Sequence, residues 1–266
     1  MEILLFRAAL APSLVLIVSL VGRRLGPRLG GRLLGAPTTT GPFLFVLCFS
    51  AGASTAAGAA HGSAAGQLTV TCFCLVYGRL APGRRPIPTL AVAVTCSLIA
   101  ALIATALDNI LLTALVSLFL VTAGLLTWPS APPARPKPAA VRQWELPARM
   151  AIAAAMVLGS TEIAVAAGPF IGGIASSMPV LLAVMGPSAH RTSDVLAGEM
   201  MHGALISCLA TISFLTVLAL ALKPLAYAAF PLALAALGLA DLYPRALDRH
   251  KKSRPSQRTV GRASIA

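Results

Sequence analysis

The hexapeptide GPRLGG at residues 26–31 recurs as GPFIGG at residues 168–173, a spacing of 142 residues. Further matches at this spacing, or at one residue less, follow in the same order: Pro37 with Pro179, Arg7 with Arg149, His61-Gly62 with His202-Gly203, and Leu68 with Leu209. An ordered set of matches at one spacing indicates an internal duplication. A duplication constrains the architecture of the whole chain, so it is considered before any single helix.

Composition indicates the class of protein in which these motifs lie. Hydrophobic residues make up 57% of the 266 residues, charged residues make up 11%, and eight side chains are acidic. A soluble domain has about 25% charged residues, so this chain cannot cover the surface of a water-soluble globule. The composition excludes a secreted disulfide scaffold, a cytosolic enzyme and a nucleic-acid-binding domain. It predicts a polytopic protein in a lipid bilayer.

Nine apolar stretches are candidate membrane spans. They lie at about residues 3–22, 38–51, 54–80, 87–106, 109–128, 148–167, 174–189, 194–222 and 224–243. The segment at 129–147 is Pro-rich and basic, as expected of a cytoplasmic linker. The predicted organisation is therefore a first transmembrane repeat at 1–128, the linker at 129–147, a second transmembrane repeat at 148–244 and a disordered basic cytoplasmic tail at 245–266.

The distribution of Lys and Arg predicts the orientation of the spans. With the N-terminus outside and the C-terminus cytoplasmic, 19 of the 21 basic residues face the cytoplasm, as the positive-inside rule requires. This bias also explains the net charge of +13 without a nucleic-acid partner. Aromatic residues expected to anchor the chain at the membrane surface lie beside the same basic segments: Tyr77, Trp128, Trp144 and Tyr243.

The second repeat is predicted to enter the membrane in the opposite orientation, because five spans, an odd number, separate the first spans of the repeats. The loop at 23–36 carries four Arg, whereas its counterpart at 168–178 has no charge, which agrees with loops on opposite sides. We therefore expect an all-α polytopic membrane protein. It has about nine transmembrane helices in a five-plus-four inverted repeat with broken or short helices, as in many secondary transporters.

The duplicated GPxxGG…P pattern, followed by a turn such as Gly186-Pro187-Ser188-Ala189-His190-Arg191, resembles a family of uncharacterised bacterial inner-membrane proteins. The resemblance covers about residues 7–80 and 149–222. It implies the bacterial inner membrane as the location and adds support for the duplicated fold, but it implies no activity. In that family a basic residue often occupies the position of His202.

Two breaks in the apolar pattern are candidate substrate-binding segments. The hydroxyl side chains at these breaks are Thr38, Thr39 and Thr40 in the first repeat, and Ser176 and Ser177 in the second. Irregular backbone inside a membrane is tolerated only where protein or water satisfies it. Helix N-termini with free amides also bind anions. The alternative is that both breaks are ordinary loops at the membrane surface.

Four ionisable side chains lie within predicted spans. Glu162 is in the middle of its span, Glu199 and His202 are one turn apart, and His61 is the counterpart of His202. Carboxylates in hydrocarbon are functional candidates by default, so we predict that Glu162 and Glu199 couple proton movement and that both histidines contact the substrate. The alternative is that these groups only hold helices together. No metal or cofactor is expected. The two histidines occupy equivalent positions because of the duplication, and this match by itself does not indicate a shared binding site.

Small residues on the span at 54–80 predict a close helix contact. Gly52, Gly58, Gly62 and Gly66 are expected to form one ridge of small residues, the last three at a spacing of four residues. A face without side chains lets a neighbouring helix approach closely.

These features predict a secondary transporter, a proton-coupled exporter or permease for a small organic molecule, with anions as one candidate class. It is not expected to be an enzyme. One alternative is a membrane enzyme acting on a polyprenyl or lipid phosphate, which would use the HRTSD sequence at 190–194. A second alternative is an accessory membrane subunit. The expected partners are a small-molecule substrate and the lipid bilayer, with a homodimer as one candidate assembly.

Overall fold

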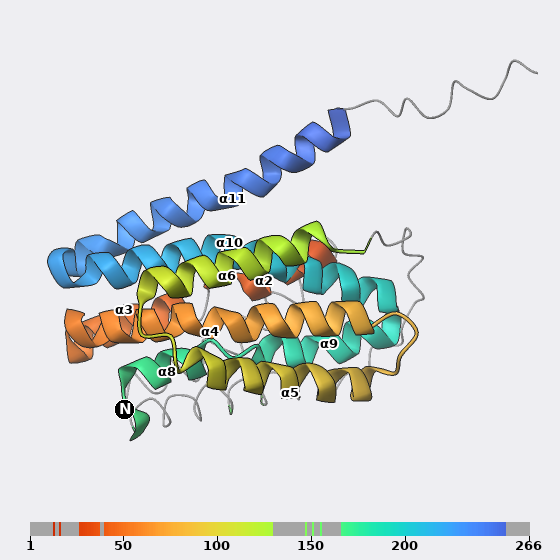
Figure 1. Ribbon diagram of the computed structural model, residues 1–266, viewed down its shortest axis with the longest axis horizontal. Helices are drawn as coiled ribbons and strands as arrows, with labels where there is room; N and C mark the ends of the chain where they lie inside the picture. Colours follow the sequence, from red (N-terminus) through yellow and green to blue (C-terminus); the bar gives the residue numbers. More distant parts are fainter. Residues whose placement is uncertain are drawn as a thin grey trace, which may run out of the picture.

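The computed structural model describes residues 27–37, 40–129 and 166–253, and five isolated helical residues elsewhere. All regular structure in these ranges is helical (Figure 1). Three segments are long and apolar enough to cross a membrane: Pro86–Ala104, Pro169–Thr192 and Asp194–Leu242. The predicted all-helical class is confirmed. The predicted spans at 3–22 and 148–167 lie almost entirely outside the described residues, as do Glu162 and the linker.

The described helices follow one another in a simple order. They are α2 (Pro27–Gly35), α3 (Thr40–Ala51), α4 (Ala53–Leu80), α5 (Pro86–Ala104), α6 (Ile110–Leu126), α8 (Pro169–Ser176), α9 (Val180–Thr192), α10 (Asp194–Leu225), the 3₁₀ turn η1 (Ala226–Ala228) and α11 (Ala229–Ser253). Because α11 continues to Ser253, the prediction of a disordered tail is wrong for residues 245–253.

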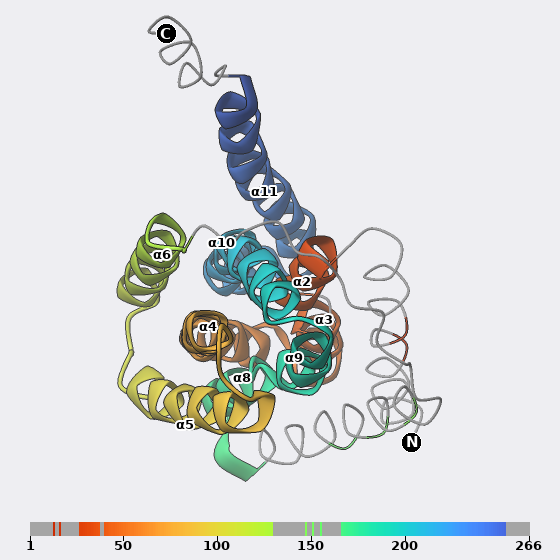
Figure 2. The ribbon, with the colours of Figure 1, turned by 90° about the vertical axis from the view of Figure 1, so that its right-hand side faces the viewer.

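Two long antiparallel helices, α4 and α10, form the centre of the bundle (Figure 2). Helix α5 packs on α4, α11 packs on α10, and α6 lies against both central helices. Most residues of α4 are buried, because its many Ala, Gly, Ser and Thr side chains let neighbouring helices approach closely. By contrast, α5 and α6 expose large apolar side chains such as Leu102 and Phe119, as helices that face lipid do.

Local sequence determines where several helices begin. Pro86 occupies the first turn of α5, where its missing N–H loses no hydrogen bond. The Asn109 side chain caps α6 by accepting from two backbone N–H groups, at 2.9 and 3.2 Å. Gly52 and Gly168 precede α4 and α8 at φ values of +86° and +89°. This left-handed region favours glycine, since a Cβ would clash with the backbone.

The two GPxxGG motifs form short helices rather than loops. Helix α2 begins at Pro27 and packs on α10, and α8 begins at Pro169 and packs on α4. The predicted loops at 23–36 and 168–178 are therefore wrong over their described residues. The prediction failed because glycine and proline are unfavourable in most helix positions. Here proline occupies the first turn, and glycine removes side chains from a helix contact.

Each short helix touches the backbone of a long helix through glycines. The four contacts, measured from a Cβ added to the glycine to a carbonyl oxygen, are Gly31 to Met200 at 1.9 Å, Gly173 to Ala59 at 2.1 Å, Gly203 to Arg28 at 2.1 Å and Gly62 to Phe170 at 1.9 Å. The predicted packing on the glycine face of α4 is thus confirmed for Gly58, Gly62 and Gly66, but it is wrong for Gly52, where a Cβ would meet nothing within 4 Å. Since no side chain fits between these backbones, the glycines fix where α2 and α8 cross the long helices.

Candidate functional site

Two discontinuous helices cross the bundle, and their breaks coincide with the predicted binding segments. The break between α2 and α3 includes Pro37, and that between α8 and α9 covers Ser177 to Pro179. The second break lies near the middle of Pro169–Thr192, a segment of 24 residues that is apolar enough to span a membrane. A break at that depth needs polar groups from its surroundings to satisfy its backbone.

The α8–α9 break is satisfied by hydroxyl groups of α4. Ser63 Oγ donates to the carbonyl oxygen of Gly173 at 3.3 Å and lies 3.3 Å from Ser176 Oγ. Ser177 Oγ donates to the Ser63 carbonyl oxygen at 3.1 Å. Thr69 Oγ1 lies 3.5 Å from the Ser177 carbonyl oxygen. These five residues form what we call the break cluster, and it includes both predicted serines.

The break cluster continues onto α5. Ser97 Oγ donates to the backbone carbonyl oxygen of Thr69 at 3.1 Å and to that of Ala93, in its own helix, at 2.9 Å. Both Thr69 and Ser97 are buried. A chain of hydroxyls therefore joins the broken helix, the central α4 and α5, whose outer face exposes large apolar side chains.

The first break has a related but smaller arrangement. Thr211 of α10 donates through Oγ1 to the carbonyl oxygen of Gly35, the last residue of α2, at 2.8 Å. Gly35 and Ser177 are separated by 142 residues, so a threonine hydroxyl from a long helix lies near the equivalent carbonyl at both breaks, although Thr69 donates mainly to the Gly66 carbonyl oxygen of its own helix at 2.7 Å. Thr40 is buried at the start of α3. Thr38 and Thr39 lie outside the described residues.

The buried polar groups of the bundle carry almost no charge. In the described part of the chain, the buried polar side chains are hydroxyls, the Gln67 amide and the His190 imidazole. Within the same residues, no group of three His, Cys, Asp or Glu could hold a metal ion. The chemistry available in the interior is therefore hydrogen bonding by small neutral groups, which suits binding better than bond cleavage.

The structure does not bring the two predicted histidines together. The His61 ring lies against Phe170, with ring centroids 5.0 Å apart, and near the Leu107 backbone at the start of α6. The His202 ring lies 5.1 Å from that of Trp128, just past the end of α6. Helix α6 has 17 residues, about 25 Å at 1.5 Å per residue. The two histidines therefore belong to opposite ends of the bundle.

Glu199 lies in an ion pair at one end of the bundle. Its Oε2 is 3.9 Å from Arg28 Nε, and the two side chains are 33% and 43% exposed. The pair joins α10 to α2 beside the Gly203 contact. Glu199 is thus a partly exposed group rather than an isolated carboxylate in hydrocarbon.

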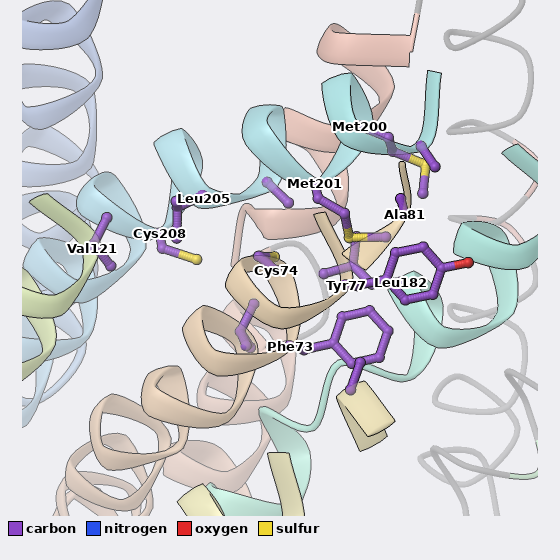
Figure 3. Packing of buried hydrophobic residues seen from close by; sticks show 14 of the residues in the cluster. Phe73, Cys74, Tyr77, Ala81, Val121, Leu182, Met200, Met201, Leu205 and Cys208 are labelled. Atoms are coloured by element: carbon purple, nitrogen blue, oxygen red, sulfur yellow. The ribbon is translucent and has the colours of Figure 1, made fainter. Parts of the chain in front are cut away.

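A buried Tyr77–His190 pair was missed by sequence reasoning. Tyr77 Oη lies 3.2 Å from His190 Nδ1, and both side chains are buried, Tyr77 within the apolar cluster drawn in Figure 3. The prediction of Tyr77 as a surface anchor is therefore wrong. The predicted turn at 186–191 is also wrong, since these residues continue α9. A Cβ at Gly186 would lie 3.0 Å from Met201 Cε and 3.4 Å from Tyr77 Cζ, so the glycine leaves space for the Met201 side chain beside the Tyr77 ring.

Comparison with protein-family models, with curated proteins and with solved structures found no match for this chain.

Proposed function

We propose that this chain is a secondary transporter of a small organic molecule, which binds at the break cluster between α4 and α8–α9. The observation that carries the proposal is the interruption of a 24-residue apolar segment near its middle by a break lined with hydroxyls. Transport sites are commonly built where discontinuous helices meet near the middle of the bilayer. A purely structural helix has no need of such a break, because an unbroken helix satisfies its own backbone.

We further infer that the two halves are inverted repeats. Three relations support this: α2 packs on α10 as α8 packs on α4, the glycine contacts keep the sequence spacing, and α4 runs antiparallel to α10. In the end-on view α5 and α11 lie on opposite sides of the central pair, and α6 lies against both central helices (Figure 2). A two-fold axis through α6 would relate the halves and leave α6 without a counterpart.

The proposed mechanism alternates access between the two ends of the bundle. At one end α2 is held to α10 by glycine packing and the Arg28–Glu199 pair. At the other, α8 is held to α4 by glycine packing and the Ser63 and Ser177 hydrogen bonds. Loosening one short helix while the other stays packed would open the break cluster to one side only. Proton coupling is assigned to Glu162 and Glu199.

The lipid-phosphate alternative has less support. His190, the first residue of its phosphate-binding motif, points into the bundle and contacts Tyr77, whereas Arg191 is exposed. The groups that would act together on a phosphate therefore do not converge.

Flux measurements on purified protein in liposomes test the proposal. A screen of radiolabelled small organic molecules is expected to find one whose flux falls at least about five-fold in Ser177→Ala. Ser213→Ala is the matched control, because the Ser213 hydroxyl bonds only within its own helix, to the Leu209 carbonyl oxygen at 3.0 Å. Proton movement linked to this flux is expected to disappear in Glu162→Gln or Glu199→Gln.

Two results would contradict the proposal. Folded protein without flux of any molecule would favour the accessory-subunit alternative. Release of phosphate from a polyprenyl phosphate, lost in Arg191→Ala, would favour the enzyme.

A further inference from the structure

Three buried polar atoms in the middle of the bundle have no hydrogen-bond partner of normal geometry, although one of them, on Thr71, lies within reach of the Cys208 thiol. They are Oε1 of Gln67 and the hydroxyl oxygens of Thr71 and Ser117. The three side chains are 4%, 1% and 0% exposed. Leaving such a group unpaired in the interior costs free energy, so these atoms form an unfavourable region for a packed protein interior.

The register of α4 and α6 brings these atoms together. The two helices run in the same direction (Figure 1), and a Cβ on Gly124 of α6 would lie 2.5 Å from Leu75 Cδ2 of α4. Ser117 lies two turns before Gly124, and Thr71 and Gln67 lie one and two turns before Leu75. Each turn advances about 5.4 Å along both helices, so Ser117 lies level with the pair on α4.

Helix α10 forms the third wall of this region. The Cys208 thiol lies beside the Thr71 hydroxyl. Cys208 and Val121, one turn after Ser117, belong to one apolar cluster (Figure 3). We call the junction of α4, α6 and α10 at Gln67, Thr71 and Ser117 the polar seam. It continues from the break cluster, because Ser63, Gln67 and Thr71 follow one another at four-residue intervals on one face of α4.

Helix α6 is the wall that is least firmly held. Its buried residues are small or polar apart from Val121, so it buries little apolar area against the central pair. Its outer face carries exposed leucines and Phe119. Its movement would therefore expose few apolar groups to water while uncovering all three unpaired polar atoms.

We propose that the transported molecule extends from the break cluster into the polar seam, that α6 moves aside to admit it, and that this molecule is uncharged and carries hydrogen-bond donors. This inference rests on the proposed transport function and names its substrate class. Gln67 Oε1 can only accept a hydrogen bond, so the molecule must donate one. No Asp, Glu, Lys or Arg is buried in the described ranges, and a net charge would be left uncompensated in the interior.

The native cysteines give a first test that needs no known substrate. Hydroxyl-radical footprinting of the full chain in liposomes, read by mass spectrometry, reports which thiols contact water. Cys208 is 0% exposed and borders the seam, whereas Cys48 is 3% exposed and belongs to a different apolar cluster. Cys208 is expected to oxidise about ten-fold faster than Cys48, and in Gln67→Leu its rate should fall to that of Cys48. Equal rates in the native protein would overturn the inference.

Flux of chosen probes gives the second test. Uncharged urea, glycerol and lactamide are compared with lactate, phosphate and choline in the same liposomes. Flux of uncharged probes alone is expected, reduced at least about ten-fold in Gln67→Leu and retained in Ser213→Ala. Gln67→Leu should fold normally, since it replaces an unpaired polar group with an apolar one of similar size, and its melting temperature verifies this.

The outcomes separate the two proposals. Flux of a charged probe that Gln67→Leu leaves intact would overturn the substrate class and keep the transporter. Absence of any flux would contradict the transporter, and the Cys208 footprint would then decide separately whether the seam opens.

Discussion

Gly62 of α4 provides the sharpest test of how the short helices are held. A Cβ at this position would lie 1.9 Å from the carbonyl oxygen of Phe170 and 2.7 Å from its carbonyl carbon. Real Cβ contacts stay above 3.0 Å, so the α8 backbone would have to retreat by at least about 1.1 Å. A backbone carbonyl inside a helix cannot rotate away as a side chain can. We therefore predict that Gly62→Ala separates α8 from α4.

The size of the effect follows from the contacts at stake. Forcing extra volume into a packed region costs about 1–3 kcal/mol. Displacing α8 also weakens the Ser63 and Ser177 hydrogen bonds, at about 0.5–1.5 kcal/mol each. Alanine returns about 1 kcal/mol through its better helix propensity. The net loss is about 1–5 kcal/mol, equivalent to a fall in melting temperature of about 2–20 °C for a domain of this size.

Thermal melting of purified variants measures this loss. Gly198→Ala is the matched control, because Gly198 also lies inside a long helix but a Cβ there meets nothing within 4 Å. That variant should be about 0.5–1 kcal/mol more stable than the parent. Gly203→Ala, which meets Arg28 at 2.1 Å, should lose about as much as Gly62→Ala. If Gly62→Ala melts within about 2 °C of Gly198→Ala, the backbone contact does not hold α8, and the reasoning fails.

Three smaller effects should be visible in the same melting assay. Tyr77→Phe leaves His190 Nδ1 without its 3.2 Å partner and should cost about 1–3 kcal/mol; an unchanged melting temperature would mean that the pair is not formed. Asn109→Ala removes the cap of α6 and should cost about 0.5–2 kcal/mol, whereas no loss would show that α6 begins elsewhere. Glu199→Gln breaks the partly exposed pair with Arg28 and should lower the free energy of unfolding by at most about 1 kcal/mol, a difference that high salt should remove. A larger loss would show that the pair is more deeply buried than the structure indicates.

Sequence reasoning predicted the features that depend on local pattern. Composition gave the all-helical class, the four-residue spacing of Gly62 and Gly66 gave the helix contact on α4, and serines before a proline gave Ser176 and Ser177 as break residues. Each of these follows from residues within a few turns of one another. The helices α2 and α8 escaped prediction because their glycines are tolerated only in the presence of a partner backbone, which lies more than 100 residues away in the chain.

The partners of polar groups could not be predicted for the same reason. The sequence groups Glu199 with His202, its neighbour on the same helix face, yet the structure pairs Glu199 with Arg28 of α2 at 3.9 Å. Tyr77 lies beside a basic turn and has the amphipathic character of an interfacial anchor, yet it is 0% exposed. Whether a side chain on a helix lies in polar or apolar surroundings depends on the helix packed against it, which local sequence does not reveal. Likewise, only the register of α4 against α6 shows that the polar atoms of the polar seam lie at the same level of the bundle.

The Tyr77–His190 pair shows where the two halves differ in more than sequence. At the repeat spacing of 141 or 142 residues, the counterparts of Tyr77 and His190 are Leu218 and Cys48. Leu218 and Cys48 belong to one apolar cluster, whereas Tyr77 and His190 share a hydrogen bond. The same pair of positions is therefore filled once by apolar packing and once by a buried polar contact. In one half, apolar packing at these positions holds the helices together. It avoids the free-energy cost of burying a phenol and an imidazole. The polar pair is thus not a requirement of the fold. It distinguishes the end of the bundle that carries His190 and Arg191 from the opposite end.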